Sequence, residues 1–340
     1  MSQNALVIGG GAFGTALASV LCHNFKKVVV KVRSRDIYQA IKKGENYIYL
    51  PGLKLHGKIE PALSWDEVKK ETGGDVGVIV SGLPTAAIQD FYTENFEVIS
   101  SYLSESIPFI SLSKGIDPDT LDLADDLFFD LFPKFKENFA FLSGPSFAKE
   151  IIQEQITLVT VAGRSRSNLL KVSEMLDCPY FKALPSYDVK GVLLGGALKN
   201  VLAIAGGIIE GLGYNNNTRA AMITRGIAEM LRFGKVFNAR PETFYGLSGM
   251  GDLILTTTGE LSRNKTFGFE IAKGRKAGEI IDSSRSVVEG YKTTRAVFDL
   301  SQKYEVRARI FDAVYDVLYR DQDPREVIER IMKTPAKFEN

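Results

Sequence analysis

The first residues arranged for chemistry are glycines close to the N-terminus. Residues 9–14 (GGGAFG) have the spacing G-x-G-x-x-G, with Gly9, Gly11 and Gly14 between an apolar run and an apolar stretch of helical character. In such a loop the first glycine allows a tight turn, the second admits a pyrophosphate, and the third lets a helix pack on the strand. Free amides at the start of that helix attract phosphate. Because a strand precedes the loop and a helix follows it, the motif favours a dinucleotide site over a merely flexible turn.

Basic residues stand where a second strand would end. The β-branched run 27–32 predicts a strand, and Arg33, Arg35 and Asp36 follow it. At this place an acidic residue holds the ribose 2′-hydroxyl of NAD, whereas a guanidinium can bind the 2′-phosphate of NADP with two hydrogen bonds. Because the arginines come first, the sequence favours NADP. The alternative is that the arginines are solvated and Asp36 binds NAD.

A lysine interrupts a strongly apolar segment. Residues 191–214 are long enough to span a bilayer, but Lys199 and other polar residues lie among them, so a buried helix is favoured. A desolvated lysine has a lowered pKa, which suits proton transfer near neutral pH. Gly195 and Gly196 on the same helix face predict the close approach of another group, because glycine costs helix stability. The alternative is a lysine that reaches solvent from an ordinary core helix.

A third cluster lies in residues 246–268 (GLSGMGDLILTTTGELSRNKTFG). Glycines surround Asp252, and Ser262, Arg263 and Asn264 stand at the start of a predicted helix. A guanidinium flanked by a hydroxyl and an amide at a helix start can bind phosphate. The alternative is a capped helix start with a surface arginine.

Two shorter motifs follow predicted strands. Lys114 of SLSKG comes directly after the run 108–113, and Gly144 and Ser146 belong to SGPSFA at the end of the run 139–144. Ligands of α/β folds bind outside the carboxyl ends of the strands. These residues are therefore candidates for ligand contacts.

The motifs require a scaffold of alternating strands and helices. Apolar runs predict strands at 5–8, 27–32, 75–82, 108–113, 139–144 and 157–163, with helical patterns between several of them, beginning at 13–22. This alternation predicts the α/β class with a mostly parallel sheet covered on both faces.

The character of the chain changes after Tyr187. Strand-like runs end there, and helical patterns such as 218–233 and 295–305 fill the rest. A chain of 340 residues exceeds one ordinary core. We expect a dinucleotide-binding domain over 1–186 and an all-helical domain for substrate and catalysis over 187–340.

Composition limits the classes of partner. With 45% hydrophobic and 24% charged residues, the chain has the composition of a soluble globular enzyme. Its net charge of +1 gives no overall electrostatic field that would attract it to nucleic acid or a membrane surface. Cys22 and Cys178 lack metal-ligand spacing, and a reducing compartment fits them, so we expect no metal site and a cytoplasmic location. His23 and His56 both lie early in the chain, which disfavours a catalytic histidine in the helical domain.

Together the motifs resemble one enzyme family. They occur in the order GGGAFGTALA, SLSKGID, LSGPSFAKE, GGALKNVLAIAGGI, GLSGMGDLILTTTGELSRN and VVEG, spread over nearly the whole chain. This set resembles bacterial NAD(P)-dependent glycerol-3-phosphate dehydrogenases. The resemblance implies a Rossmann-type N-terminal domain followed by an all-helical C-terminal domain. It also implies reversible reduction of dihydroxyacetone phosphate by NADPH or NADH to sn-glycerol 3-phosphate, which feeds glycerophospholipid synthesis.

The resemblance also implies the site residues. Lys199 would be the catalytic lysine. The implied substrate contacts are Lys114, Gly144, Ser146, Lys199, Asp252, Ser262, Arg263 and Asn264. The implied cofactor contacts are Gly9, Gly11, Ala12, Phe13, Gly14, Arg33, Arg35, Lys114, Ala148, Arg263, Val287 and Glu289. At Phe13 and at Arg33 the family often has tryptophan.

A homodimer is the remaining expectation from the family, and the polar residues within 191–214 argue against a membrane span. Two rival interpretations stay open. A β-hydroxyacid or 6-phosphogluconate-type dehydrogenase shares the two-part layout and a lysine, but we find no match for its motifs in this sequence. A nicotinamide-sensing regulator would need a partner or nucleic-acid surface, and no basic stripe stands out.

Overall fold

The structure is a computed structural model that describes residues 3–283, 288–333 and 335. Contacts within the chain divide it into two compact units. Unit 1 comprises residues 1–114 and 122–193, and unit 2 comprises residues 115–121 and 194–340. The expected boundary near Ser186 lies a few residues before the chain passes into unit 2, and the short excursion at 115–121 has no counterpart in the expectation from sequence.

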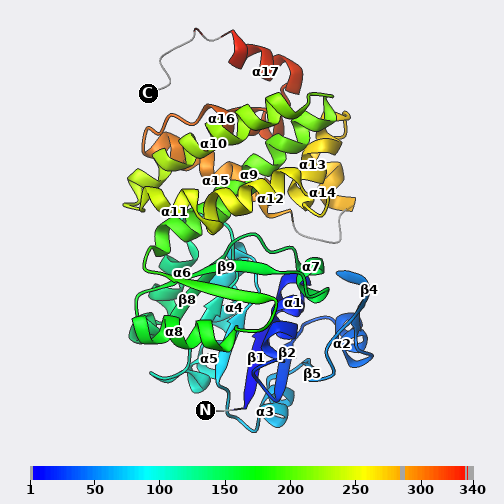
Figure 1. Cartoon of the computed structure of the whole chain (residues 1–340), viewed down its shortest axis with the longest axis vertical. Coiled ribbons are helices and arrows are strands. Elements are labelled where there is room, and N and C mark those ends of the chain that lie inside the picture. The colour runs from blue at the N-terminus through cyan, green and yellow to red at the C-terminus, as the bar shows by residue number, and fades with distance from the viewer. Residues whose placement is uncertain (1–2, 284–287, 334, 336–340) are drawn as a thin grey trace. The chain divides into compact units, whose positions relative to one another are not determined.

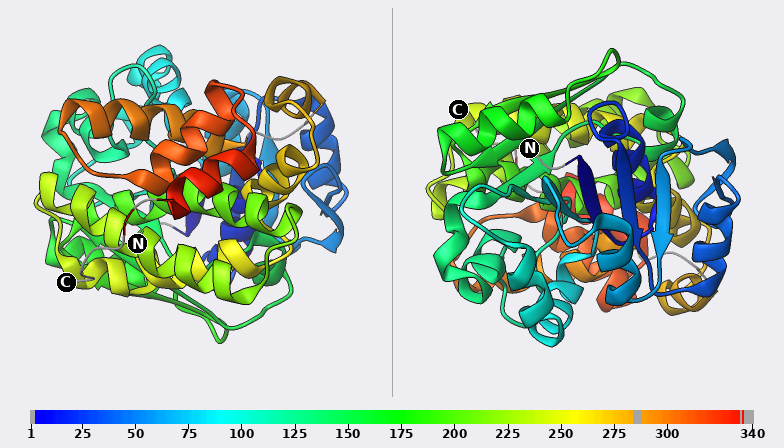
Figure 2. Two further views of the ribbon diagram at one scale, coloured as in Figure 1. Left: turned by 90° about the horizontal axis from the view of Figure 1, so that it is seen from above. Right: turned by 90° about the horizontal axis from the view of Figure 1, so that it is seen from below.

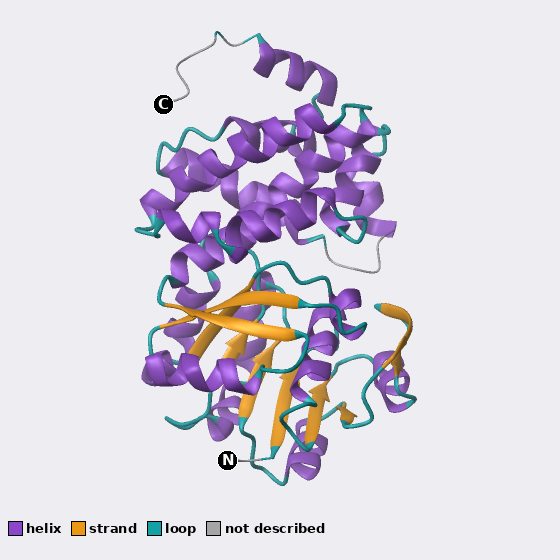
Figure 3. Cartoon of the chain, in the orientation of Figure 1, coloured by secondary structure: helices purple, strands orange, loops and turns teal. Residues whose placement is uncertain are grey.

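Unit 1 contains an eight-stranded sheet with the order β10-β9-β8-β7-β6-β1-β2-β5 (Figures 1 and 3). The strands are β1 (Asn4–Ile8), β2 (Lys27–Lys31), β5 (Ile59–Ala62), β6 (Val78–Ser81), β7 (Phe109–Ser111), β8 (Phe139–Ser143), β9 (Thr157–Gly163) and β10 (Phe181–Ser186). Every neighbouring pair is parallel except β8 and β9. The predicted mostly parallel sheet is therefore confirmed.

Helices cover both faces of this sheet (Figure 2, right). They are α1 (Ala12–Leu21), α2 (Arg35–Lys42), α3 (Trp65–Thr72), α4 (Ile88–Glu94), α5 (Phe96–Tyr102), α6 (Ala124–Leu131), α7 (Ala148–Ile152) and α8 (Arg166–Met175), with short 3-10 turns at Thr85–Ala87 and Pro133–Asn138. On one face Val7 and Val30 share a core with Leu17 of α1. Elsewhere in unit 1 Phe109 packs against Tyr92 and Phe128. Because the central strands β1, β6, β7 and β8 are covered on both faces, they are almost continuously apolar.

The order of the strands creates a switch point beside β1. The chain passes from β1 to β2 and β5 on one side and then returns to β6 on the other. Open α/β sheets bind ligands at such a point, outside the carboxyl ends of the strands. The loops after β1 and β6 meet there, because the amide of Gly82 donates to the carbonyl of Ile8 at 2.8 Å.

The strands missed by the sequence analysis lie outside the centre of the sheet. β5 and β10 are its two edge strands, and β3 (Glu45–Asn46) and β4 (Leu50–Lys54) form a separate antiparallel hairpin. Pro61 lies in β5 and Pro185 in β10. Proline cannot donate to a central ladder, but an edge strand tolerates it. The same prolines obscured the strand pattern in the sequence.

Within the described residues, the named elements of unit 2 are all helices (Figures 1 and 3). They are α9 (Val189–Gly211), which begins in unit 1, α10 (Asn216–Val236), α11 (Pro241–Tyr245), a π-helical turn η3 (Leu247–Gly251), α12 (Asp252–Thr258), α13 (Arg263–Ala272), α14 (Ala277–Ser283), α15 (Glu289–Lys303), α16 (Arg309–Tyr319) and α17 (Pro324–Met332). Figure 2 (left) shows these helices packed side by side. The predicted helical C-terminal part is confirmed.

Helix α9 has the length and composition of a membrane-spanning helix, but its most apolar stretch is wholly buried inside the protein. Such burial is typical of a core helix. α9 packs closely on α13, because a Cβ atom on Gly268 would lie 2.1 Å from the carbonyl oxygen of Ile204. This close packing brings the start of α13 next to the middle of α9.

Candidate active site

The glycine-rich loop follows β1 at the switch point of the sheet. Gly9 has φ +106°, and a Cβ atom on Gly14 would lie 2.2 Å from the carbonyl oxygen of Gly9. The protein's own backbone therefore requires both glycines. A Cβ atom on Gly11 would have no neighbour within 4 Å. Gly11 thus leaves an open space that internal packing does not explain, and this space fits the close approach of a pyrophosphate.

The first turn of α1 is suited to an anion. Its N-cap, Gly11, has no side chain to cap the helix, and no acidic residue lies in the first turn, where Ala12 and Phe13 begin the helix. The amides and the positive end of the helix dipole consequently favour a negative charge at this place. The loop and helix together could hold a dinucleotide phosphate.

Four further predicted residues of unit 1 lie in the same region as Phe13, namely Lys114, Gly144, Ser146 and Ala148. The Nζ of Lys114, in the loop after β7, donates to the carbonyl of Gly144 at 3.1 Å and to the Oγ of Ser146 at 3.4 Å. The same ammonium lies 5.2 Å from the centre of the Phe13 ring. Ala148 begins α7 and packs, like Phe13, against the core of unit 1. Unit 1 therefore brings a positive charge close to the glycine-rich helix.

The basic residues after β2 lie at the start of α2. Arg33, Arg35 and Asp36 are all exposed around Ser34, whose Oγ caps the helix by accepting from the amide of Ile37. The end of β2 adjoins the glycine loop, because the amide of Gly9 donates to the carbonyl of Lys31 at 2.9 Å. Both arginines and the aspartate are thus available to a ligand that extends from the loop.

Lys199 lies inside unit 2 and forms a buried ion pair. Its Nζ is 3.2 Å from the Oδ1 of Asp252, and their side chains are only 8% and 2% exposed. The alternative of a lysine that reaches solvent is therefore wrong for Lys199. A buried ammonium beside a carboxylate is held in one orientation, as an acid–base group must be.

Glycine places Asp252 beside α9. A Cβ atom on Gly195 would lie 2.6 Å from the carbonyl oxygen of Ser248, in the π-helical turn that ends just before Asp252. The close approach predicted from the glycines of α9 is thus met by the protein's own backbone. It fixes the start of α12 one turn from Lys199 along α9.

The residues of the SRN motif take up different positions at the start of α13. The Oγ of Ser262 caps the helix by accepting from the amide of Lys265, and Arg263, the first helical residue, is exposed. The Nδ2 of Asn264 donates to the Oδ1 of Asn200 at 2.9 Å, and its Oδ1 accepts from the amide of Gly290 at 3.1 Å. Asn264 therefore links the lysine helix to the start of α15, where Glu289 lies. Val287 lies outside the described residues.

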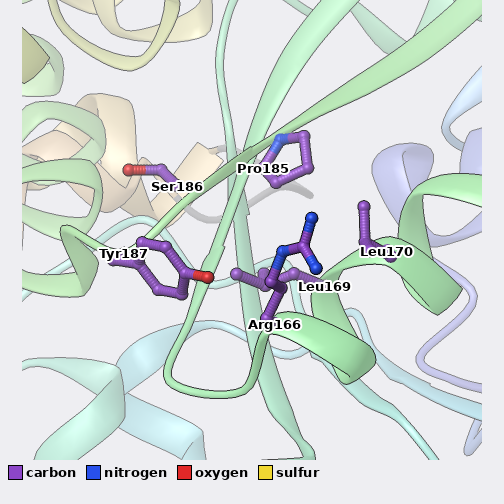
Figure 4. A pocket seen from close by; sticks show the side chains of 6 residues that line it. All are labelled: Arg166, Leu169, Leu170, Pro185, Ser186 and Tyr187. Carbon is purple, nitrogen blue, oxygen red and sulfur yellow. The ribbon is translucent and has the colours of Figure 1, made fainter.

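Other features of the described residues offer less chemistry. They contain no group of three or more His, Cys, Asp or Glu residues that could hold a metal. Both cysteines are buried and free, and burial raises the pKa of Cys22 to about 12, so its thiol is unreactive. A pocket of about 190 Å³ lies between the start of α8 and the end of β10 (Figure 4), and none of its lining residues belongs to the predicted site. It is lined by Arg166, Leu169, Leu170, Pro185, Ser186 and Tyr187.

One residue missed by the sequence analysis supports the glycine loop. The side chain of Asn46, from the hairpin β3–β4, donates to the carbonyl of Gly10 at 3.0 Å and to the Oγ1 of Thr15 at 2.9 Å. An asparagine in a short polar segment carries no sequence signal for such a contact, because the fold alone brings the two segments together.

Comparison with known proteins agrees with this arrangement. The family model described as NAD-dependent glycerol-3-phosphate dehydrogenase N-terminus matches residues 4–169, and its C-terminus counterpart matches residues 188–329. Proteins named glycerol-3-phosphate dehydrogenase [NAD(P)+] from Leptospira biflexa and Solidesulfovibrio magneticus are 40% and 41% identical to this chain, and each match covers 98% of it. The matches cover 98% and 99% of those relatives.

A solved structure gives the same result. The glycerol-3-phosphate dehydrogenase of Coxiella burnetii has a TM-score of 0.89 and 29% identity, with 97% of this chain and 99% of that chain covered. Both halves of the family model, the full-length relatives and the fold coincide. The chain therefore belongs to the NAD-dependent glycerol-3-phosphate dehydrogenase family.

Proposed function

We propose that this chain reduces dihydroxyacetone phosphate to sn-glycerol 3-phosphate with NADH or NADPH, in a reversible reaction. The observation that carries this proposal is the buried ion pair of Lys199 and Asp252. When bound, the nicotinamide supplies a hydride to carbon 2 of the substrate, and the carbonyl oxygen that becomes negative needs a proton. Unit 2 offers one oriented ammonium for this purpose.

Lys199 gives its proton to the oxygen on carbon 2 during reduction and takes it back during oxidation. Asp252 orients the ammonium and supplies a counter-charge at 3.2 Å. Since both side chains are almost completely buried, water competes little for the ammonium. Proton transfer by a positioned group of this kind contributes about 10²–10⁴ to the rate.

The start of α13 binds the phosphate of the substrate in this proposal. Arg263 is exposed at the first helical position, and the first turn of α13 carries no acidic residue. Ser262 remains the helix cap, and Asn264 is held toward this end by Asn200 and Gly290. The helix dipole and the guanidinium both favour a dianion. In unit 1, Lys114, Gly144 and Ser146 are the proposed substrate contacts.

Unit 1 holds the cofactor in this proposal. Gly9, Gly11, Ala12, Phe13 and Gly14 form the pyrophosphate site, and Lys114 and Ala148 lie beside it. Arg33 and Arg35 contact the 2′-phosphate, so NADP is preferred to NAD. In unit 2, Arg263 and Glu289 are the described residues that we assign to the cofactor as well.

The cellular setting is proposed on the resemblance alone. The enzyme acts as a homodimer in the cytoplasm, and its product enters glycerophospholipid synthesis. Sedimentation of the purified protein tests the dimer, and a monomer at micromolar concentration would contradict it.

The activity is tested by the absorbance of the reduced nicotinamide in the presence of dihydroxyacetone phosphate. We expect oxidation of NADPH and NADH that depends on the substrate, with a higher kcat/KM for NADPH. Dihydroxyacetone without phosphate should lose kcat as well as affinity, because phosphate binding orients the reacting carbonyl. The absence of substrate-dependent oxidation with either cofactor would refute the proposed function.

A further inference from the structure

We propose that Asn46 is a positioning residue of the cofactor site: its buried carboxamide holds the glycine-rich loop, so the hairpin β3–β4 is part of the pyrophosphate-binding apparatus. This inference rests on the proposed function, because it concerns the same cofactor site. It adds a residue that lies outside the glycine motif and that contacts the motif only through its backbone.

The carboxamide of Asn46 joins two parts of the loop. Asn46 is completely buried, and its Nδ2 donates to the carbonyl of Gly10 at 3.0 Å and to the Oγ1 of Thr15 at 2.9 Å. Gly10 lies inside the motif and Thr15 lies in the first turns of α1. One amide group therefore fixes the turn relative to the helix that it opens.

The hydrogen bond from Asn46 to the carbonyl of Gly10 also sets the direction of the N–H of Gly11. A trans peptide is planar, so its carbonyl and its N–H point in opposite directions. All peptides of the described chain are trans. Because Asn46 holds the carbonyl of Gly10, the N–H of Gly11 points away from Asn46. Gly11 is the residue beside which internal packing leaves open space. Asn46 thus orients an amide that is placed to meet a phosphate.

The carboxamide of Asn46 uses its nitrogen for two hydrogen bonds, which indicates that its role is to donate. Among the described residues the Oδ1 of Asn46 is buried and has no hydrogen-bond partner. A flipped carboxamide would turn this oxygen toward the carbonyl of Gly10, so the two donated bonds fix the orientation. A buried unsatisfied acceptor destabilises the folded state. A side chain selected for packing alone would not carry this cost.

Backbone hydrogen bonds within the hairpin hold the segment that carries Asn46. The carbonyl of Asn46 accepts from the amide of Tyr49 at 3.2 Å, and the carbonyl of Gly44 accepts from the amide of Leu55 at 2.8 Å. Helix α2, which starts at Arg35, leads directly into β3. A short continuous segment therefore joins Asn46, which holds the glycine loop, to the basic residues that we assign to the 2′-phosphate.

Asn138 offers a matched control in the same unit. It is 5% exposed, and its Nδ2 donates to the carbonyls of Ser104 and Ile107, both at 2.7 Å. β8 runs parallel to β1 through β6 and β7. Asn138 directly precedes β8 and so lies at the amino ends of these strands, whereas the glycine loop follows the carboxyl end of β1. Loss of its amide removes the same kind of contact far from the loop.

The experiment compares Asn46→Leu with Asn138→Leu in the full-length enzyme. Calorimetric titration gives the Kd for NADP⁺ and NAD⁺, thermal unfolding without ligand gives the Tm, and steady-state kinetics separate KM from kcat. We expect both variants to lower the Tm, but only Asn46→Leu to raise the cofactor Kd and KM, by roughly tenfold, with kcat at saturating cofactor within about threefold of wild type.

Several outcomes overturn the inference. A cofactor Kd of Asn46→Leu within about twofold of wild type overturns the inference. An equal loss of cofactor affinity in Asn138→Leu also overturns it, because this would show general destabilisation. If Asn46→Leu does not fold, Thr15→Val decides, because it removes only the second acceptor. We then expect severalfold weaker binding that Thr15→Ser largely restores, and equal binding by the valine variant overturns the inference. Failure of the wild-type enzyme to bind either cofactor would instead refute the proposed function.

Discussion

The ion pair of Lys199 and Asp252 should cost more stability when one partner is removed than when both are replaced. At an effective dielectric constant of about 20, unit charges 3.2 Å apart attract by roughly 5 kcal/mol. Burial of both side chains offsets much of this attraction, because each charge loses its hydration. The net contribution of the pair to folding is therefore small.

A double-mutant cycle makes this argument quantitative. Asp252→Leu leaves the buried ammonium without this counter-charge, and Lys199→Met leaves the buried carboxylate without this cation. Each change should lower the free energy of unfolding by about 3–5 kcal/mol. The combined Lys199→Met and Asp252→Leu variant should recover most of that loss, because apolar side chains of similar volume replace both charges. All three variants should lose most of their catalytic activity, because each lacks Lys199, Asp252 or both.

Urea unfolding of the four proteins, followed by far-UV circular dichroism, gives the coupling energy. We expect a coupling of at least about 3 kcal/mol, with the double variant more stable than either single variant. A loss in the double variant equal to the sum of the single losses would refute the account of the pair as one unit. So would an unchanged unfolding free energy in Asp252→Leu.

Three further perturbations test other parts of the molecule. Gly11→Ala should leave the Tm of the ligand-free protein unchanged and weaken cofactor binding at least tenfold, because its methyl group would meet only the proposed ligand. Gly14→Ala should weaken binding and also lower the Tm. Calorimetric titration and thermal unfolding of both variants measure these effects, and full cofactor affinity in Gly11→Ala would contradict the pyrophosphate site. The combined Arg33→Ala and Arg35→Ala variant should raise the KM for NADPH far more than that for NADH in steady-state assays, and equal increases would mean that neither arginine contacts the 2′-phosphate. Burial raises the pKa of Glu229, on α10, to about 7 from 4.5. Between these two pH values the folded state binds more protons than the unfolded state, so the unfolding free energy falls as the pH rises through this range. Glu229→Gln should remove this fall and exceed wild type at pH 8 by on the order of 3 kcal/mol in urea unfolding, and parallel pH profiles for the two proteins would contradict the assigned cause.

Local patterns were sufficient for the central sheet and the glycine loop. The runs that became β1, β2, β6, β7, β8 and β9 consist mainly of hydrophobic residues, and the glycine spacing lies within the consecutive residues 9–14. Edge strands β5 and β10 both contain a proline, and β10 also alternates buried and exposed residues, so their sequence lacks that signal. The segment 115–121 belongs to unit 2 through contacts that no local pattern encodes.

The site could be predicted only as far as single segments allow. The apolar surroundings of Lys199 predicted a buried lysine, but they could not identify its partner, because Asp252 reaches it only through the packing of α9 on the turn at Ser248. The capping role of Ser262 was one of two interpretations of the sequence. Asn46 contacts a backbone carbonyl 36 residues away, and a lone asparagine gives no indication of this.

The central claim is that Lys199 carries the proton, and the turnover of Lys199→Ala tests it most directly. Lys190→Met is the matched control, since Lys190 lies on the same helix and pairs with the buried carboxylate of Asp125 at 2.9 Å. We predict that Lys199→Ala lowers kcat by about 10²–10⁴ while the cofactor Kd stays within a few fold of wild type, and that small primary amines added to the assay restore part of the rate. Lys190→Met should turn over at nearly the wild-type rate. Near-normal turnover in Lys199→Ala would contradict the account.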